Sequence, residues 1–249
     1  MSDNEKKFII NPDETLEKLG LREQYIIQKK RGYRFTIDPF LLASFTSVAP
    51  GDHILDLGTG GGILPFLLCK NNPEIPVSIT GIDIQPQYID MAERSRKGNG
   101  MENIFFKTKD IRSLDKAFAS SYDIVITNPP FFRVNEGKIS PLEETAIARH
   151  EIAIDCKTLV AKAFYCLKPK GRFIFIHRSE RLTEILIVLK EQGFCVTELQ
   201  FIFADQKSGA KLFMAQAVKA ASRQMSVKPP LIIYEDDGNY TEKVRDMYV

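Results

Sequence analysis

A glycine-rich turn between an apolar run and a helix signal constrains the fold of this 249-residue chain more than any other feature. Residues 54–62 read ILDLGTGGG, and the apolar residues 63–71 that follow have helical spacing and end before Pro73. Glycines permit positive φ angles and close approach of a ligand, and a helix N-terminus offers unpaired N–H groups. The segment therefore predicts a first strand, a ligand-binding turn and a first helix.

Strand and helix signals alternate through the rest of the chain, which indicates an α/β fold with a mostly parallel sheet. The expected strands cover residues 53–56, 77–83, 104–108, 122–127, 172–177, 194–204 and 211–219, and the expected helices cover residues 63–71, 86–98, 155–167 and 180–192. Residues 168–171, which read KPKG, are expected to close the third helix. No helix separates the last two strands, so we expect an antiparallel hairpin at one edge of a doubly wound, seven-stranded sheet.

The length fits one domain that spans the whole chain, with two segments outside the alternating pattern. Residues 1–50 precede the first core strand and are expected to pack on the domain as an extension. This extension holds two strand signals, at residues 25–30 and 33–36, and an apolar helix signal at residues 39–48. Residues 133–149 are polar with few core signals, and we expect them to form a mobile loop.

Composition indicates a soluble cytoplasmic protein. Hydrophobic residues make up 44% of the chain, yet no apolar run approaches the roughly 20 residues that a membrane helix needs. The first seven residues, MSDNEKK, lack the apolar stretch of a signal peptide. The four cysteines lie far apart and the three histidines are isolated, so we expect reduced thiols, no metal site and no membrane contact.

Details of the glycine turn exclude two common nucleotide sites. A dinucleotide pattern starting at Gly58 would require glycine at position 63, where Ile63 stands. The chain has no Gly-Lys-Ser/Thr, which excludes a phosphate-binding P-loop. Asp56, before the first glycine, would repel a pyrophosphate and suits a cationic ligand better.

Two further aspartates stand at the ends of expected strands. Asp83 ends the second strand and is placed to accept hydrogen bonds from ribose hydroxyls, and Asp110, just past the third, is placed to accept from an adenine amino group. Alone, each is better explained as a solvated loop residue or a helix cap. Together with Asp56, they place carboxylates at the ends of three successive strands, which predicts an adenosyl ligand at this edge of the sheet.

Asn128-Pro129-Pro130-Phe131 follows the fourth expected strand. Two consecutive prolines remove two backbone donors and fix two φ angles, so the strand must stop there. The corner then presents an amide side chain, carbonyl oxygens without ladder partners and an aromatic ring, a set that can hold a planar group bearing –NH2. A plain strand-ending turn is the alternative interpretation of the prolines alone.

A short basic segment offers a site for nucleic acid. Lys29-Lys30-Arg31-Gly32-Tyr33-Arg34 places four cations and a tyrosine in six residues, which suits phosphate neutralisation and base stacking. A solvated hairpin tip is an equally good interpretation, because strand signals flank Arg31 and Gly32.

The ordered set of DLGTGGG at residues 56–62, Asp83, Asp110 and the Asn-Pro-Pro-Phe corner resembles the class I S-adenosylmethionine-dependent methyltransferases, most closely the branch that methylates amino groups. Flanking segments, from near residue 20 to the C-terminus, are similar to the bacterial tRNA1(Val) (adenine(37)-N6)-methyltransferase family. These segments are residues 32–43 (GYRFTIDPFLLA), 148–151 (ARHE) and 230–240 (PLIIYEDDGNY). One departure is Phe131, where tyrosine is common, which keeps a ring for stacking but loses a hydroxyl contact.

The resemblance implies a Rossmann-like fold, S-adenosylmethionine as the cofactor and tRNA as the partner. The cofactor-binding residues that it implies are Asp56, Gly58, Gly60, Gly62, Asp83, Ile84, Asp110, Ile111 and Asn128. Thr36 and Asp38 would cap the same pocket, or else form a helix N-cap before Pro39. Arg149 and His150 would contact phosphate, or else begin a solvated helix.

For the reaction, the resemblance implies methyl transfer to adenine N6 at a catalytic corner formed by Asn128, Pro129, Pro130 and Phe131. The Asn128 side-chain oxygen and the Pro129 carbonyl would accept the two N6 hydrogens, and Phe131 would stack on the base. Catalysis would then rest on positioning and dipoles rather than on a strong base.

Other functions stay open. Glutamine N5-methylation of a release factor and guanine N2-methylation of rRNA present similar donors to the same corner, and the basic segment favours RNA. DNA adenine methylation is less consistent with a chain that shows no separate target-recognition domain. A silent cofactor-binding module would keep the fold, but the intact corner and the three aspartates favour an enzyme. We expect a monomer or a weak homodimer.

Overall fold

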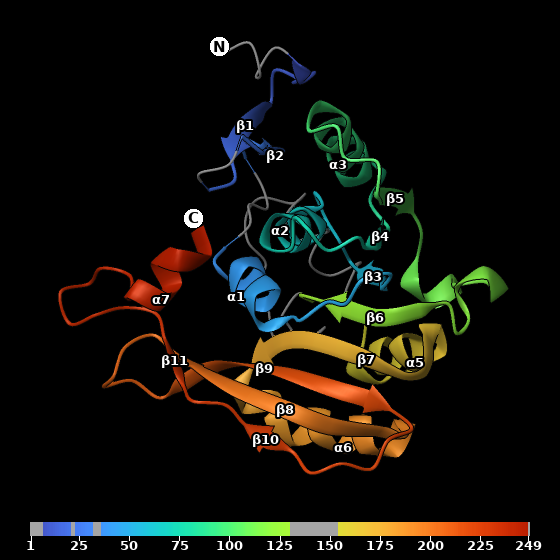
Figure 1. Ribbon diagram of the computed structural model, residues 1–249, viewed down its shortest axis with the longest axis vertical. Coiled ribbons are helices and arrows are strands. Elements are labelled where there is room, and N and C mark those ends of the chain that lie inside the picture. Colours follow the sequence, from blue (N-terminus) through green and yellow to red (C-terminus); the bar gives the residue numbers. More distant parts are fainter. Residues whose placement is uncertain (1–6, 21–22, 32–35, 130–153, 249) are drawn as a thin grey trace.

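The computed structural model describes residues 7–20, 23–31, 36–129 and 154–248 (Figure 1). They form a central nine-stranded sheet in the order β10-β8-β9-β7-β6-β3-β4-β5, with β11 also paired to β8, and a separate two-stranded ribbon. The ribbon consists of β1 (Glu14–Lys18) and β2 (Tyr25–Lys29); the sheet consists of β3 (His53–Leu57), β4 (Ser78–Asp83), β5 (Ile104–Thr108), β6 (Tyr122–Thr127), β7 (Leu167–Arg178), β8 (Phe194–Phe203), β9 (Ala210–Lys219), β10 (Ser226–Val227) and β11 (Leu231–Ile232).

The strand order confirms the expected doubly wound α/β fold. From β3 the chain runs outward through α2 (Ile63–Asn71), β4, α3 (Pro86–Gly98) and β5, and then returns to β6 on the other side of β3. Helix α5 (Cys156–Cys166) connects β6 to β7, and α6 (Leu182–Gln192) connects β7 to β8. Strands β3 to β7 pair in parallel, so their carboxyl ends share one edge, where a fold of this kind binds its ligand.

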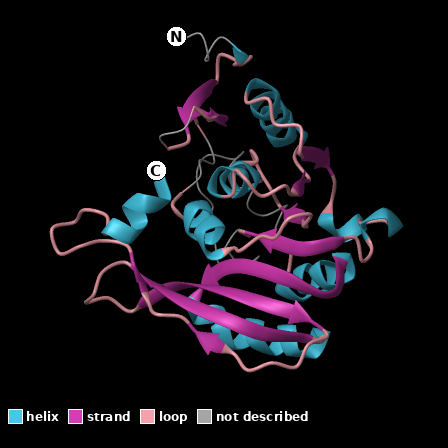
Figure 2. Cartoon of the chain, in the orientation of Figure 1, coloured by secondary structure: helices cyan, strands magenta, loops and turns pink. Residues whose placement is uncertain are grey.

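Alternate residues of the central strands supply two hydrophobic cores on opposite faces of the sheet. Ile54 and Ile124 pack with α1 (Asp38–Phe45), α2 and α3, whereas Leu55 and Val125 pack with α5 and α6. Figure 2 shows these helices on both sides of the magenta sheet. Because both faces are covered, the strands read as nearly continuous apolar runs. Within the described ranges, no helix has the length and apolar character to cross a membrane.

The sheet extends further at its β8 edge than the sequence predicts. β10 and β11 both pair in parallel with β8, so the sheet has nine strands rather than seven, and the β8–β9 hairpin does not lie at the edge. The antiparallel pairing of β8 with β9 is confirmed. The two additional strands were missed because a strand of two residues carries no periodic signal.

The junction of α5 and β7 also differs from the prediction. α5 ends at Cys166 and β7 begins at Leu167, so residues 168–171 belong to the strand and not to a loop. Lys170 has a φ of +63°, and the pairing with β6 shifts register between Tyr122 and Ile124. Pro169 and Gly171 indicate the end of a helix, and for that reason the sequence did not predict that β7 already begins at Leu167, with an irregular first segment.

The β1–β2 ribbon packs on α3 (Figure 1). The backbone N–H of Tyr25 donates to Asn99 Oδ1 at 2.9 Å and that of Ile27 donates to Ser95 Oγ at 2.9 Å, so side chains of α3 satisfy the edge of β2. β2 pairs with the preceding strand β1, which the sequence did not predict. Most of the expected strand at residues 33–36 lies outside the described residues, as does the expected loop at residues 133–149.

Aromatic stacking fastens the C-terminal segment to α1, and Figure 1 shows this end of the chain beside that helix. The ring of Phe40 lies 4.3 Å from that of Tyr248, and Tyr248 lies 5.7 Å from Tyr240. Tyr240 in turn stacks on Tyr234 at 5.3 Å. The short helix α7 (Glu242–Arg245) stands between these rings in the chain. α1 itself ends three residues before the predicted boundary at residue 48.

Candidate cofactor and substrate site

The glycine turn after β3 has the open backbone expected of a ligand-binding loop. Gly58 and Gly60 have φ angles of +76° and +53°, which L side chains rarely adopt. A Cβ atom added at either position would meet nothing within 4 Å, so this face of the loop is open. The backbone N–H groups of Gly58 and Thr59 both donate to the Ile82 carbonyl at 2.9 Å and fix the loop on the end of β4.

Gly62 has a packing role instead of an open face. Its φ is +85°, and an added Cβ would lie 2.6 Å from Cζ of Phe106 and 3.2 Å from Cβ of Ala92. Its backbone N–H already donates to the Thr59 carbonyl at 3.0 Å. The structure therefore explains this glycine by the close approach of α2 to β5 and α3, and gives no support to the predicted cofactor contact.

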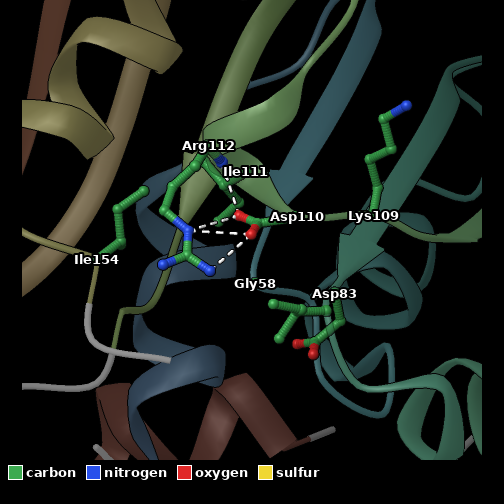
Figure 3. A pocket seen from close by; sticks show the side chains of 8 residues that line it. Gly58, Asp83, Lys109, Asp110, Ile111, Arg112 and Ile154 are labelled. Carbon is green, nitrogen blue, oxygen red and sulfur yellow. Dashed lines mark hydrogen bonds and ion pairs between the residues drawn. The ribbon is translucent and has the colours of Figure 1, made fainter. Parts of the chain in front are cut away.

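One pocket lies at the carboxyl ends of β3, β4 and β5 (Figure 3). It is lined by Gly58, Asp83, Ile84, Lys109, Asp110, Ile111, Arg112 and Ile154. Five of the predicted cofactor residues are thus brought together, with the isoleucines as apolar walls beside the two aspartates. Their individual contacts with a cofactor stay predictions.

Asp83 holds the glycine loop through its carboxylate. Oδ2 accepts the N–H of Gly60 at 2.9 Å, and Oδ1 accepts the N–H of Gln85 at 2.9 Å. Each carboxylate oxygen has two lone pairs, so each retains capacity for a further donor such as a ribose hydroxyl. Burial raises the pKa of Asp83, and these backbone donors oppose the rise.

Asp110 is both a cap and a pocket residue, so the two interpretations of it are compatible. It precedes the 3-10 turn η2 (Ile111–Ser113), and its Oδ1 accepts the backbone N–H of Arg112 at 2.8 Å. The Arg112 guanidinium also forms an ion pair with the carboxylate, with Nη2 2.6 Å from Oδ2 (Figure 3). The hydrogen bond from Arg112 lowers the pKa of Asp110.

Asp56 is more deeply enclosed than the sequence indicates. It is only 1% exposed and does not line the pocket. Burial, with a smaller contribution from the charge of Asp83, raises the pKa of Asp56 to about 7. Asp56 Oδ2 and Thr59 Oγ1 are buried, and neither has a partner within hydrogen-bonding distance among the described residues. The Thr59 hydroxyl nevertheless lies close enough to the carboxyl to oppose the rise in the pKa of Asp56. Because an unpaired buried carboxylate is costly, the pair fits an incoming cationic group such as an ammonium.

The strand-end corner lies beside the glycine turn. β6 pairs with β3 through Ile126 and Asp56, and the Thr127 hydroxyl donates to the Leu57 carbonyl at 2.7 Å. Asn128 and Pro129 follow directly and are half-buried. Pro130 and Phe131 lie outside the described residues.

Thr36 and Asp38 stand at the start of α1 and do not line the pocket. The N-cap residue of α1 is Ile37 and no side chain caps the helix, so the predicted N-cap at Thr36 or Asp38 is wrong. The Asp38 backbone N–H donates to Thr36 Oγ1 at 3.4 Å, in a turn that precedes the helix. Burial raises the pKa of Asp38. The cofactor contact predicted for this segment has no support in the described geometry.

The basic segment is partly neutralised within the chain. Lys29 pairs with Asp13 at 2.6 Å, and Lys30 Nζ donates to the Pro12 carbonyl at 2.7 Å. Arg31 is exposed. Tyr33, Arg34, Arg149 and His150 lie outside the described residues. The structure therefore weakens the phosphate-binding interpretation for Lys29 and Lys30.

Lys109, Arg112 and Ile154 line the pocket but were not predicted. Arg112 follows Asp110 by two positions, a spacing that allows the side chain to fold back on the carboxylate, whereas nothing in the sequence links Ile154 to this edge. In the part of the chain that is described, no group of three His, Cys, Asp or Glu side chains is arranged to hold a metal ion.

The profile of the methyltransferase domain family matches residues 49–213. The tRNA1(Val) (adenine(37)-N6)-methyltransferase of Dyadobacter fermentans is 27% identical over 206 residues, which cover 81% of this chain and 82% of that relative. The protein of the same name from Actinobacillus pleuropneumoniae serotype 7 is 25% identical over 231 residues, which cover 91% of this chain and 93% of that relative.

Solved structures show the same fold. A predicted O-methyltransferase, Atu636, from Agrobacterium tumefaciens has a TM-score of 0.68 at 20% identity, over 85% of this chain and 95% of that chain. A SAM-dependent methyltransferase from Aquifex aeolicus has a TM-score of 0.53 at 17% identity, and the match covers 73% of this chain and 89% of that chain.

The doubly wound sheet has the fold of the class I methyltransferases, with a pocket at the carboxyl ends of β3, β4 and β5, and the matching sequence profile shows the enzyme class. The expected fold class, the enzyme class and S-adenosylmethionine as the cofactor are thereby confirmed. By its sequence profile, the chain belongs to the methyltransferase domain family.

Proposed function

We propose that this methyltransferase methylates N6 of an adenine in tRNA. The observation that carries the proposal is the position of Asn128 and Pro129 at the end of β6, beside the glycine turn, in a chain whose relatives are named for this reaction. The names of those relatives specify adenine 37 of a valine tRNA, and we propose the same target here.

The described residues fit the parts of the cofactor. S-adenosylmethionine, when bound, supplies a sulfonium methyl group that a nitrogen lone pair can attack. The open backbone of Gly58 and Gly60 would hold the methionine portion, and Asp56 would accept its ammonium. Asp83 would accept from the ribose hydroxyls and Asp110 from the adenine amino group.

Asn128 would orient the substrate amine. The lone pair of an adenine N6 is delocalised into the ring, so the nitrogen is a poor nucleophile. The Asn128 side-chain oxygen and the Pro129 carbonyl can accept both N6 hydrogens, which favours a pyramidal nitrogen whose lone pair is free to attack. An amide is not a base, so Asn128 removes no proton. The proton becomes acidic after methylation and leaves to water, which makes positioning the source of the rate enhancement.

The site requires an unstacked base. A nucleotide in a loop reaches a strand-end corner at lower cost than a paired one, because no base pair has to be broken. This requirement favours an anticodon-loop adenine.

The proposal is tested by acceptor competition. The protein is incubated with methyl-labelled S-adenosylmethionine and, separately, with total tRNA, rRNA and release factor from cells that lack it. We expect label in tRNA as N6-methyladenosine. Label in guanine of rRNA or in glutamine of the release factor would replace the proposal with one of those alternatives.

Asn128→Ala tests the role of the corner. We expect kcat to fall about 100- to 1000-fold, as when one positioned donor of an oxyanion hole is removed, while the Kd for S-adenosylhomocysteine changes less than about twofold. Asn128→Asp is the matched control, because a carboxylate keeps the accepting oxygen, and it should retain more activity than the alanine variant. Undiminished turnover by Asn128→Ala would refute the assigned role.

A cytoplasmic location and a monomeric or weakly dimeric state are part of the same proposal. A tRNA substrate favours the cytoplasm, and size-exclusion chromatography with light scattering measures the oligomeric state.

A further inference from the structure

We propose that Arg112 is a specificity-determining residue of the cofactor site, whose guanidinium competes with the purine 6-amino group for the carboxylate of Asp110. The inference concerns cofactor selection and does not depend on the identity of the methyl acceptor.

Arg112 occupies the hydrogen-bonding capacity of Asp110. Oδ1 accepts the Arg112 backbone N–H at 2.8 Å and Nε at 3.0 Å, while Oδ2 accepts Nε at 2.9 Å and Nη2 at 2.6 Å. A carboxylate has about four lone-pair directions in its plane. Three N–H groups of one residue, with that of Nε shared between the two oxygens, are therefore directed at the acceptor that an adenine amino group would use.

The Arg112 side chain is free to leave. It is 59% exposed, and within the described residues it bonds to no group other than Asp110. Figure 3 shows the guanidinium turned towards the Asp110 carboxylate, with Ile154 on its other side. An exposed ion pair of this kind is weak, so a ligand can displace it at small cost.

The competition depends on the substituent at the 6-position of the purine. An amino group donates to Asp110 and must displace the guanidinium. A 6-oxo group cannot donate, but it can accept from the guanidinium. Arg112 thus weakens binding of the adenosyl ligand, assists an inosyl analogue and accelerates release of the adenosyl product.

The test is calorimetric titration with S-adenosylhomocysteine and with its 6-oxo analogue, S-inosylhomocysteine. Arg112→Ala should bind S-adenosylhomocysteine about two- to fivefold more tightly than the wild type, the range set by an exposed ion pair. S-inosylhomocysteine should bind no more tightly to the variant. Arg112→Lys keeps the positive charge but lacks the planar fork of the guanidinium. Its affinity for S-adenosylhomocysteine should lie between those of the wild type and Arg112→Ala.

Two further measurements separate competition from other effects. Lys109→Ala removes a neighbouring pocket cation that pairs with Asp115, so it should change the affinity for both ligands in parallel. Raising the salt concentration should bring the affinity of the wild type for S-adenosylhomocysteine closer to that of Arg112→Ala, because salt screens the pair. Equal tightening of both ligands in Arg112→Ala, or weaker binding of S-adenosylhomocysteine, would overturn the proposal.

Discussion

Replacing Asp56 by asparagine should stabilise the free protein while it weakens cofactor binding. The carboxyl is fully buried, and its Oδ2 has no hydrogen-bond partner among the described residues. Burial raises the pKa of Asp56 from 3.8 to about 7. Because the folded state holds this proton more tightly than the unfolded state, ionisation of Asp56 opposes folding. The free energy of unfolding is unaffected below about pH 4. It falls as the pH rises from near 4 towards 7, and the loss is complete above that pH.

The magnitude follows from the two pKa values. One pKa unit corresponds to about 1.4 kcal/mol, so a rise from 3.8 to about 7 costs roughly 4 kcal/mol above pH 8 and roughly half as much at pH 5, relative to a neutral side chain. Asp56→Asn removes the titration and is nearly isosteric. Its free energy of unfolding should therefore exceed that of the wild type by a margin that grows by about 2–3 kcal/mol from pH 5 to pH 8.

Urea denaturation of both proteins at pH 5 and pH 8, without ligand, measures this margin. The difference between the two proteins cancels the titration of every group that does not interact with Asp56. A second titration with S-adenosylhomocysteine at pH 8 should show weaker binding to Asp56→Asn, since a neutral amide pairs poorly with an ammonium. A variant less stable than the wild type at pH 8, or a margin independent of pH, would refute the reasoning.

Two other substitutions test the geometry of the loop. Gly62→Ala places a Cβ 2.6 Å from Phe106 at a φ of +85° and should lower the free energy of unfolding by about 2–4 kcal/mol, measured in urea. Gly100→Ala, at a φ of +66° with nothing within 4 Å, is the matched control and should cost only about 1–2 kcal/mol; equal losses would contradict the packing role of Gly62. Asp83→Ala removes the acceptor of the Gly60 and Gln85 N–H groups and should weaken S-adenosylhomocysteine about 10- to 100-fold by calorimetry, so an unchanged Kd would contradict the ribose assignment.

The centre of the fold was predictable because its signals are redundant. Strands β3, β4 and β6 carry buried apolar residues on both faces, and glycine, proline and polar residues mark where the central strands stop. The peripheral strands, such as β1, lack such redundant signals. β1 reads ETLEK, too polar to be recognised, and its Glu14 pairs with Arg94 of α3, 80 residues further along the chain.

The same distinction explains which parts of the site were found. Asp83 and Asp110 were predicted to share a pocket because parallel strands bring their carboxyl ends to one edge, a rule that needs no side-chain detail. The pairing of Arg112 with Asp110, the enclosure of Asp56 and the contact of Gly62 with Phe106 depend on side-chain directions. No periodicity or motif encodes those directions.

The most direct test of the central claim is nucleoside mapping of the valine tRNA from cells with and without this protein. The account predicts N6-methyladenosine at position 37 in the presence of the wild type, none in its absence, and little with Asn128→Ala. An unmodified adenine 37 in the presence of active wild-type protein, or the same modification in cells that lack it, would contradict the account.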